Sequence, residues 1–116
     1  MEQSLITAAQ RAQLIANGRG SRKAMVDDIQ PVVRLFTPDA HATWLLAALD
    51  PADGDTAYGL CDVGIGMPAL GHVKLSDLAS VVGPRKAPIL HDRYFRPTRS
   101  LGEYTRLAQS NRSIVD

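Results

Sequence analysis

The residues best suited to metal binding or nucleophilic catalysis in this sequence are one cysteine and three histidines: Cys61, His41, His72 and His91. Their spacing matches no metal motif, since no two histidines fall at positions i and i+4 of one predicted helix. Cys61 follows Leu60 in an apolar run, where a free cysteine usually serves as a small buried side chain. We therefore expect no catalytic residue, no metal ligand and no cofactor, and a protein that is not an enzyme.

The spacing of Gly64, Gly66 and Ala69 matches the glycine-rich fingerprint of dinucleotide-binding proteins. That fingerprint works because the free amides at the start of a helix bind the pyrophosphate. Pro68 removes one of those amides, and the residues that follow have the pattern of a strand. We interpret the segment as a tight turn.

An acidic run has some of the character of a calcium-binding loop: Asp50, Asp53 and Asp55. The EF-hand loop requires oxygen ligands at its positions 1, 3 and 5 and a glutamate at position 12. Counted from Asp50, these later positions hold Ala52, Gly54 and Cys61, which cannot supply such ligands. We interpret the run as a solvated hairpin turn and keep its three carboxylates as a candidate surface for a protein partner.

Basic and aromatic residues alternate near the end of the sequence. The candidate partner-binding residues there are Arg85, Lys86, Arg93, Tyr94, Arg96 and Arg99. Such a combination suits phosphates and stacked bases, and arginine also forms forked contacts with carboxylates. A dedicated nucleic-acid binder usually has a far more basic domain than a chain of pI 7.9. We expect these residues to dock on another protein, and nucleic acid is the alternative partner.

The charges of the sequence nearly cancel but are unevenly spread. There are 13 Lys and Arg against 12 Asp and Glu, which gives a formal net charge of +1. Residues 1–26 carry +3, residues 27–62 carry −6 and residues 74–116 carry +4. A folded domain with this distribution has a dipolar surface that can orient a charged partner.

The length of 116 residues predicts one domain, 1–116, with a core of about 6–108. Trp44 is the only tryptophan among six aromatic residues, and beside two leucines it is the predicted centre of that core. We expect neither a membrane span nor a secretory signal. A single cysteine agrees with a reducing compartment, so we expect a cytoplasmic protein.

Helix boundaries are indicated by two capping boxes: Thr7 with Gln10, and Ser100 with Glu103. The N-terminal helix is predicted to end at Asn17-Gly18 and to bury an apolar stripe of Ala8, Ala12, Leu14 and Ile15. A short middle helix is predicted to be capped by Ser76 and to run through Val82. The C-terminal helix is predicted to bury Leu101, Tyr104 and Leu107.

Strands are predicted over 31–36, 70–75 and 89–95. The segment 37–49 is ambiguous, because Thr37 as a cap and the alanine-rich run favour a helix. Two apolar runs around the Asp-Gly pair at 53–54 favour a hairpin instead, and we prefer the hairpin. The predicted fold is α+β, an antiparallel sheet of about four or five strands with an N-terminal, a middle and a C-terminal helix.

The order of several short blocks is itself informative: Pro31–Pro38, Ala42–Leu46, Leu49–Pro51, Tyr58–Asp62, Gly66–Gly71, Leu75–Leu78, Gly83–Pro84 and Asp92–Phe95. Over about residues 6–108 the chain resembles domain of unknown function 2958, a family of small bacterial proteins. The resemblance implies an α+β fold with 43–46 as a strand, and a setting in plasmids, phages and conjugative elements. The resemblance supplies no activity and no catalytic residues that could be carried over to this chain.

Members of that family often have Pro-Glu-Leu-Gly-Tyr where this chain has Pro68-Ala69-Leu70-Gly71-His72. The departure removes a carboxylate and a phenol, so a mechanism built on that glutamate does not carry over. The function we expect is that of a small accessory protein of a bacterial mobile genetic element that binds another protein, with host defence as a candidate target. The alternatives are a nucleic-acid-binding accessory protein and, third, an enzyme built on Asp62, His72, His91 and Asp92.

Overall fold

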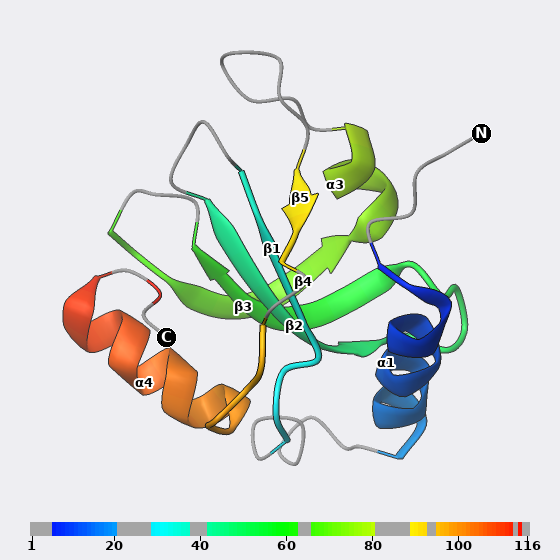
Figure 1. Ribbon diagram of the computed structural model, residues 1–116, viewed down its shortest axis with the longest axis horizontal. Helices are drawn as coiled ribbons and strands as arrows, with labels where there is room; N and C mark the ends of the chain where they lie inside the picture. Colours follow the sequence, from blue (N-terminus) through cyan, green and yellow to red (C-terminus); the bar gives the residue numbers. More distant parts are fainter. Residues whose placement is uncertain are drawn as a thin grey trace.

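The computed structural model describes residues 6–20, 29–37, 42–62, 66–80, 89–92, 95–112 and 114. The strands are β1 (Val33–Phe36), β2 (Thr43–Leu49), β3 (Thr56–Asp62), β4 (Ala69–Lys74) and β5 (Leu90–His91). They form one antiparallel sheet in the order β4-β3-β2-β1-β5 (Figure 1). The described helices are α1 (Ala8–Gly20), α3 (Leu75–Ser80) and α4 (Leu101–Asn111), so the predicted α+β class is confirmed. None of these helices is long and apolar enough to cross a membrane.

The hairpin of β2 and β3 is confirmed, and the helical alternative for 37–49 is wrong. Leu45 faces Leu60 across the pair, and the register shifts at a bulge between Leu46 and Ala48. β2 is the central strand, and all its residues from Trp44 onward are buried. A strand buried on both faces loses the alternating pattern that identifies strands in a sequence, so tertiary burial overrides the helical propensity of its alanines.

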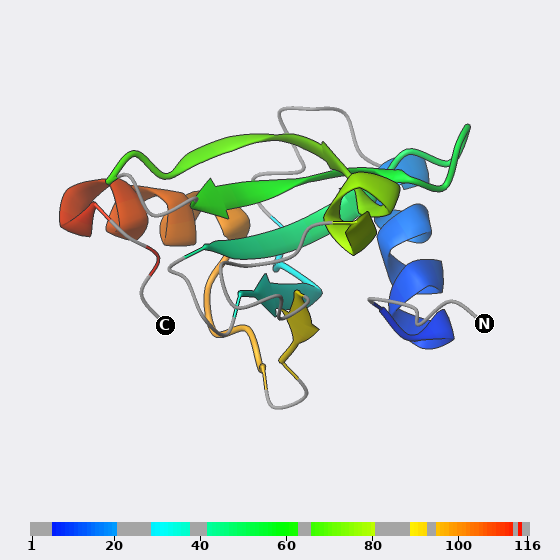
Figure 2. The same cartoon turned by 90° about the horizontal axis from the view of Figure 1, so that it is seen from above.

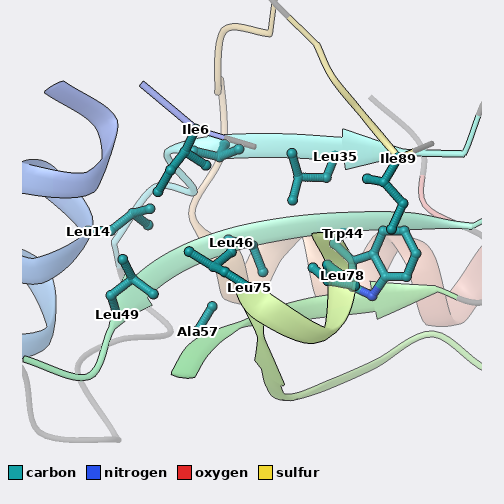
Figure 3. Close-up of a cluster of buried hydrophobic side chains, with 11 residues drawn as sticks. Ile6, Leu14, Leu35, Trp44, Leu46, Leu49, Ala57, Leu75, Leu78 and Ile89 are labelled. Atoms are coloured by element: carbon teal, nitrogen blue, oxygen red, sulfur yellow. The ribbon is translucent and has the colours of Figure 1, made fainter. Parts of the chain in front are cut away.

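Two hydrophobic cores lie on the two faces of the sheet. The first gathers Trp44, Leu46 and Leu35 with Leu14 of α1 and Leu78 of α3 (Figure 3). The second consists of Leu45, Ala47, Ala48, Leu60, Leu101, Tyr104 and Ala108. Figure 1 shows α3 above the strands and α4 below them, so β2 lies between the two layers of helices. The predicted burial of Trp44 is confirmed, since only 7% of it is exposed.

The first predicted capping box is present at the start of α1. The Gln10 amide N donates to Thr7 Oγ1 at 3.1 Å, and the Thr7 amide N donates to Gln10 Oε1 at 2.9 Å. The predicted apolar stripe is partly wrong, because Leu14 is buried but Ala8 and Ala12 are exposed. α1 therefore packs through a narrower face than its sequence indicates.

The predicted end of α1 at Asn17-Gly18 is wrong, since the helix continues to Gly20. A Cβ on Gly18 would collide with the carbonyl oxygen of Leu49, so this glycine allows the helix to lie directly against the end of β2. Asn17 Nδ2 donates to the Ala47 carbonyl at 2.8 Å. Both residues therefore serve helix-to-strand packing rather than helix termination.

The predicted cap of α3 is also wrong, because Ser76 lies inside a helix that begins at Leu75. The cap comes from Asp55, 21 residues earlier: its Oδ1 accepts from the Ser76 amide at 2.9 Å, and Ser76 Oγ donates to its Oδ2 at 2.7 Å. The Leu75 amide donates to the Asp55 carbonyl at 2.9 Å. Val82, the predicted end, lies outside the described residues.

The last strand is shorter than the predicted 89–95. β5 contains only Leu90 and His91. Its pairing with β1 ends with a hydrogen bond that the Asp92 amide donates to the Arg34 carbonyl at 2.9 Å. The Phe95 amide donates back to the Asp92 carbonyl at 3.4 Å, so the chain turns there toward α4. The capping box at the start of α4 is present, with the Glu103 amide donating to Ser100 Oγ at 3.2 Å.

Candidate interaction surface

The carboxylates of the acidic turn are engaged within the chain. Asp53 Oδ1 accepts from the Asp55 amide at 2.9 Å and the Thr56 amide at 3.0 Å, and Thr56 Oγ1 donates to its Oδ2 at 2.7 Å. These bonds lower the pKa of Asp53 to about 2, and the bond from the Thr56 backbone has the largest effect. Asp50 Oδ1 accepts from the Ala52 amide at 2.8 Å. With Asp55 capping α3, all three candidate carboxylates shape the turn and the helix beside it.

Two basic residues moderate the charge of this turn. Arg11 Nη1 of α1 donates to the Gly54 carbonyl at 2.6 Å. The positive charge of Lys74 contributes to the lowered pKa of Asp53. The acidic end of the molecule is therefore less negative than the sequence segment 27–62 indicates.

The basic candidates that the structure describes lie on the segment that leads into α4. Arg96 is exposed, whereas Arg99 is half-buried with its guanidinium 6.0 Å from the ring centre of Tyr104. The Tyr104 hydroxyl accepts from the Thr98 amide at 3.1 Å, which holds the segment against the helix. The remaining candidates, Arg85, Lys86, Arg93 and Tyr94, lie outside the described residues.

Arg106 joins this group although it was not singled out from the sequence. α4 buries Leu101, Tyr104, Thr105 and Ala108, and Arg106 is on its exposed side. The period of the buried positions could have identified it, because a residue two positions from both Tyr104 and Ala108 lies nearly opposite them on the helix. We call Arg96, Arg99 and Arg106 the arginine surface.

The residues of the enzymatic alternative do not form one site. His72 lies on β4 with its ring 5.0 Å from the ring of Tyr58, whereas His91 lies on β5 and contacts Gln10 at 2.8 Å between Nε2 atoms. β4 and β5 are the two opposite margins of the sheet, four strand spacings or about 19 Å apart.

The two aspartates of the same set have structural contacts. Arg34 Nη1 donates to Asp92 Oδ2 at 3.0 Å, in an ion pair between β1 and the end of β5. Asp62 is buried, and its Oδ2 accepts from the Ile114 amide at 3.0 Å, which holds the chain beyond α4 against β3. Both contacts connect distant segments of the fold.

The candidate ligands for a metal and the candidate nucleophile are also dispersed. Among the described residues, no three His, Cys, Asp or Glu side chains come close enough to hold a metal ion. Cys61 is half-buried beside the first core, and burial raises the pKa of its thiol. A raised pKa lowers the thiolate fraction at neutral pH, which is opposite to what a nucleophile requires. Gly64 and His41 lie outside the described residues.

A hollow of about 460 Å³ lies between α1 and the segment before β1. Among the described residues that line it, the polar side chains are the amides of Gln13, Asn17 and Gln30, and none is charged. Asn17 is already bonded to β2 and to Gln13. The hollow therefore presents little to recognise a charged ligand.

Comparison with known proteins gives a family but no characterised relative. The family model described as "Protein of unknown function (DUF2958)" matches residues 5–115, nearly the whole chain. No curated protein and no solved structure matches this chain. The chain therefore belongs to the DUF2958 family, as its ordered sequence blocks indicated.

Proposed function

We propose that this protein acts by binding another protein through the arginine surface. The observation that carries the proposal is the concentration of arginine in α4 and the segment that leads into it. Residues 95–112 contain four arginines and one acidic residue, Glu103. Arginine is enriched at protein interfaces and dominates many of their binding energies.

The backbone that carries the arginine surface is anchored at the start of α4, which favours binding. α4 is fixed at its start by the capping box, and the Leu101 amide donates to the Ile29 carbonyl at 2.8 Å. Arg99 rests on the ring of Tyr104, so less side-chain freedom is lost when it binds a carboxylate. A preorganised arginine such as Arg99 gives specific, oriented contacts with acidic side chains.

A protein partner suits this surface better than nucleic acid. Binding of single strands relies on exposed rings on which bases stack. The described aromatic residues next to the arginines are Phe95, half-buried, and Tyr104, buried, with their ring centres 6.4 Å apart. Tyr104 lies under Arg99, and Phe95 packs against the second core beside Tyr104.

The wider setting that we propose is an accessory protein of a bacterial mobile genetic element whose partner belongs to host defence. This part rests on the family resemblance alone. The binding surface and its test do not depend on it.

The proposal is tested by affinity capture from a lysate of the source cells, with and without nuclease. The charge-reversed variants are Arg96→Glu and Arg106→Glu, and the matched control is Arg19→Glu on the exposed side of α1. We expect the wild type and the control to recover the same protein after nuclease treatment, and both arginine-surface variants to lose it. Recovery that disappears with nuclease would favour the nucleic-acid alternative, and equal recovery by all variants would exclude this surface.

A further inference from the structure

β4 is an edge strand of the sheet, and the alternation of its hydrogen bonds to β3 determines which of its backbone groups face outward. The Leu75 amide donates to the Asp55 carbonyl at 2.9 Å, in line with the register in which Lys74 faces Thr56. Because hydrogen-bonded and non-bonded pairs alternate in antiparallel strands, Ala69, Gly71 and Val73 bond to β3. The backbone N–H and C=O groups of Leu70, His72 and Lys74 therefore point away from the sheet.

No described residue pairs with this outer side of β4. Figure 2 shows β4 at the upper margin of the sheet and β5 at the lower margin. β4 has six residues, three times the length of β5. A long edge strand with a row of outward backbone groups is a template for pairing with another strand.

Gly71 leaves the face of the sheet open beside the outward backbone groups of β4. A Cβ at this position would meet no atom within 4 Å, and Gly71 is not among the described glycines with positive φ. In the part of the chain that the structure describes, neither close packing nor backbone conformation requires a glycine here. A glycine inside a strand weakens it, so a margin strand that contains one gains stability from pairing with a further strand.

The two ends of β4 carry opposite charge. Near its start lie Met67, which is 74% exposed, and Arg112, whose Cβ would lie 3.9 Å from a Cβ built on Gly66. Its end carries Lys74 and leads into α3, where Asp77 is exposed and Asp55 bonds to the first turn, so carboxylates outnumber the one lysine there. Antiparallel pairing of two identical strands brings the start of each beside the end of the other.

We propose that two copies of this chain pair through β4 about a two-fold axis at His72. This register places Leu70 of one copy opposite Lys74 of the other, so it uses all three outward-facing residues of the strand. Two five-stranded sheets thereby form one continuous sheet. The Met67 and Arg112 end of each copy then lies beside the Asp77 end of the other, a self-complementary contact of the kind that two-fold dimers require.

The test is the solution mass by sedimentation velocity over a wide range of protein concentration. His72→Pro removes one outward N–H and no bond to β3, and His72→Ala is the matched control for loss of the ring. We expect wild type and His72→Ala to sediment as dimers at high concentration, and His72→Pro to remain a folded monomer with unchanged far-ultraviolet circular dichroism. A wild type that is monomeric throughout, or a dimeric His72→Pro, would overturn the proposal.

Charge reversal provides a second test of the dimer in case the proline variant does not fold. Arg112→Asp and Asp77→Arg are each expected to shift the protein toward monomer, and the double reversal is expected to restore the dimer. A double variant no better than the singles would contradict the antiparallel arrangement. Arg106→Glu is expected to stay dimeric, so loss of the proposed partner and loss of the dimer are separable.

Discussion

Two glycines that face each other across β3 and β4 should respond to the same substitution in opposite ways. Gly59 and Gly71 are register partners. A Cβ on Gly59 would lie 2.8 Å from Leu46 Cα and 2.9 Å from the carbonyl carbon of Leu45, and would collide with the Leu45 oxygen. Leu45 and Leu46 are fully buried in the central strand, so their backbone cannot move aside. Gly71 meets nothing within 4 Å.

The expected magnitudes follow from these contacts. Overpacking a core costs about 1–3 kcal/mol, and displacing buried backbone belongs at the top of that range, so Gly59→Ala should cost about 3 kcal/mol or more. Gly71→Ala should add about 0.5–1 kcal/mol, because alanine restricts the unfolded chain. At about 4 °C per kcal/mol, Tm should fall by about 12 °C for the first variant and rise by about 2–4 °C for the second.

The assay is thermal unfolding of both variants beside the wild type, followed by circular dichroism at one low protein concentration. Urea titration at 25 °C should give the same order of stability. Equal Tm values for the two alanine variants would refute the argument from close packing of β3 on β2. A Gly59→Ala variant more stable than the wild type would contradict the close approach of the Leu45 backbone to Gly59.

Four further outcomes are expected. Trp44→Ala should lower the free energy of unfolding by about 3–5 kcal/mol, measured by urea titration, and a shift below about 1 kcal/mol would contradict its place in the core. The pKa of Asp53 is lowered from 3.8 to about 2, so its contribution to stability is complete above pH 4 and is lost as the pH falls toward 2. The difference in unfolding free energy between wild type and Asp53→Asn should therefore narrow over that range. A difference that widens would contradict this prediction. Cys61 should be alkylated more slowly in the native protein than in urea, because burial raises the pKa of its thiol, and Cys61→Ser should still capture the partner. Arg112→Gly should gain up to about 1 kcal/mol at low protein concentration, since Arg112 has φ of 60° where glycine is favoured, and a loss of stability would argue against this.

Local features of the fold were predictable from the sequence because they depend on neighbouring residues. Both capping boxes involve residues three positions apart, and both are present. The Asp-Gly turn between β2 and β3 is likewise local. The identity of β2 as a strand was harder, because its alanines favour a helix and burial on both faces hides the alternation.

Features that depend on distant parts of the chain were not predictable in this way. Nothing near Ser76 indicates that Asp55 supplies the cap of α3, since the two meet only through the register of β3 and β4. Gly18 looks like a helix terminator until Leu49 is placed against it. The same holds for the candidate surface, where the sequence indicated Arg96 and Arg99 but the packing of α4 was needed to add Arg106.

The central claim, that the arginine surface binds an acidic face of another protein, is tested most directly by the association rate. The captured partner is presented to wild type, to Arg96→Glu with Arg106→Glu, and to Arg19→Glu, at low and at high salt. Steering by opposite charges predicts a wild-type rate that falls strongly as salt rises and a double variant that is slow at low salt and nearly insensitive to salt, with the control close to the wild type. Equal association rates for all three proteins at both salt concentrations would contradict the account.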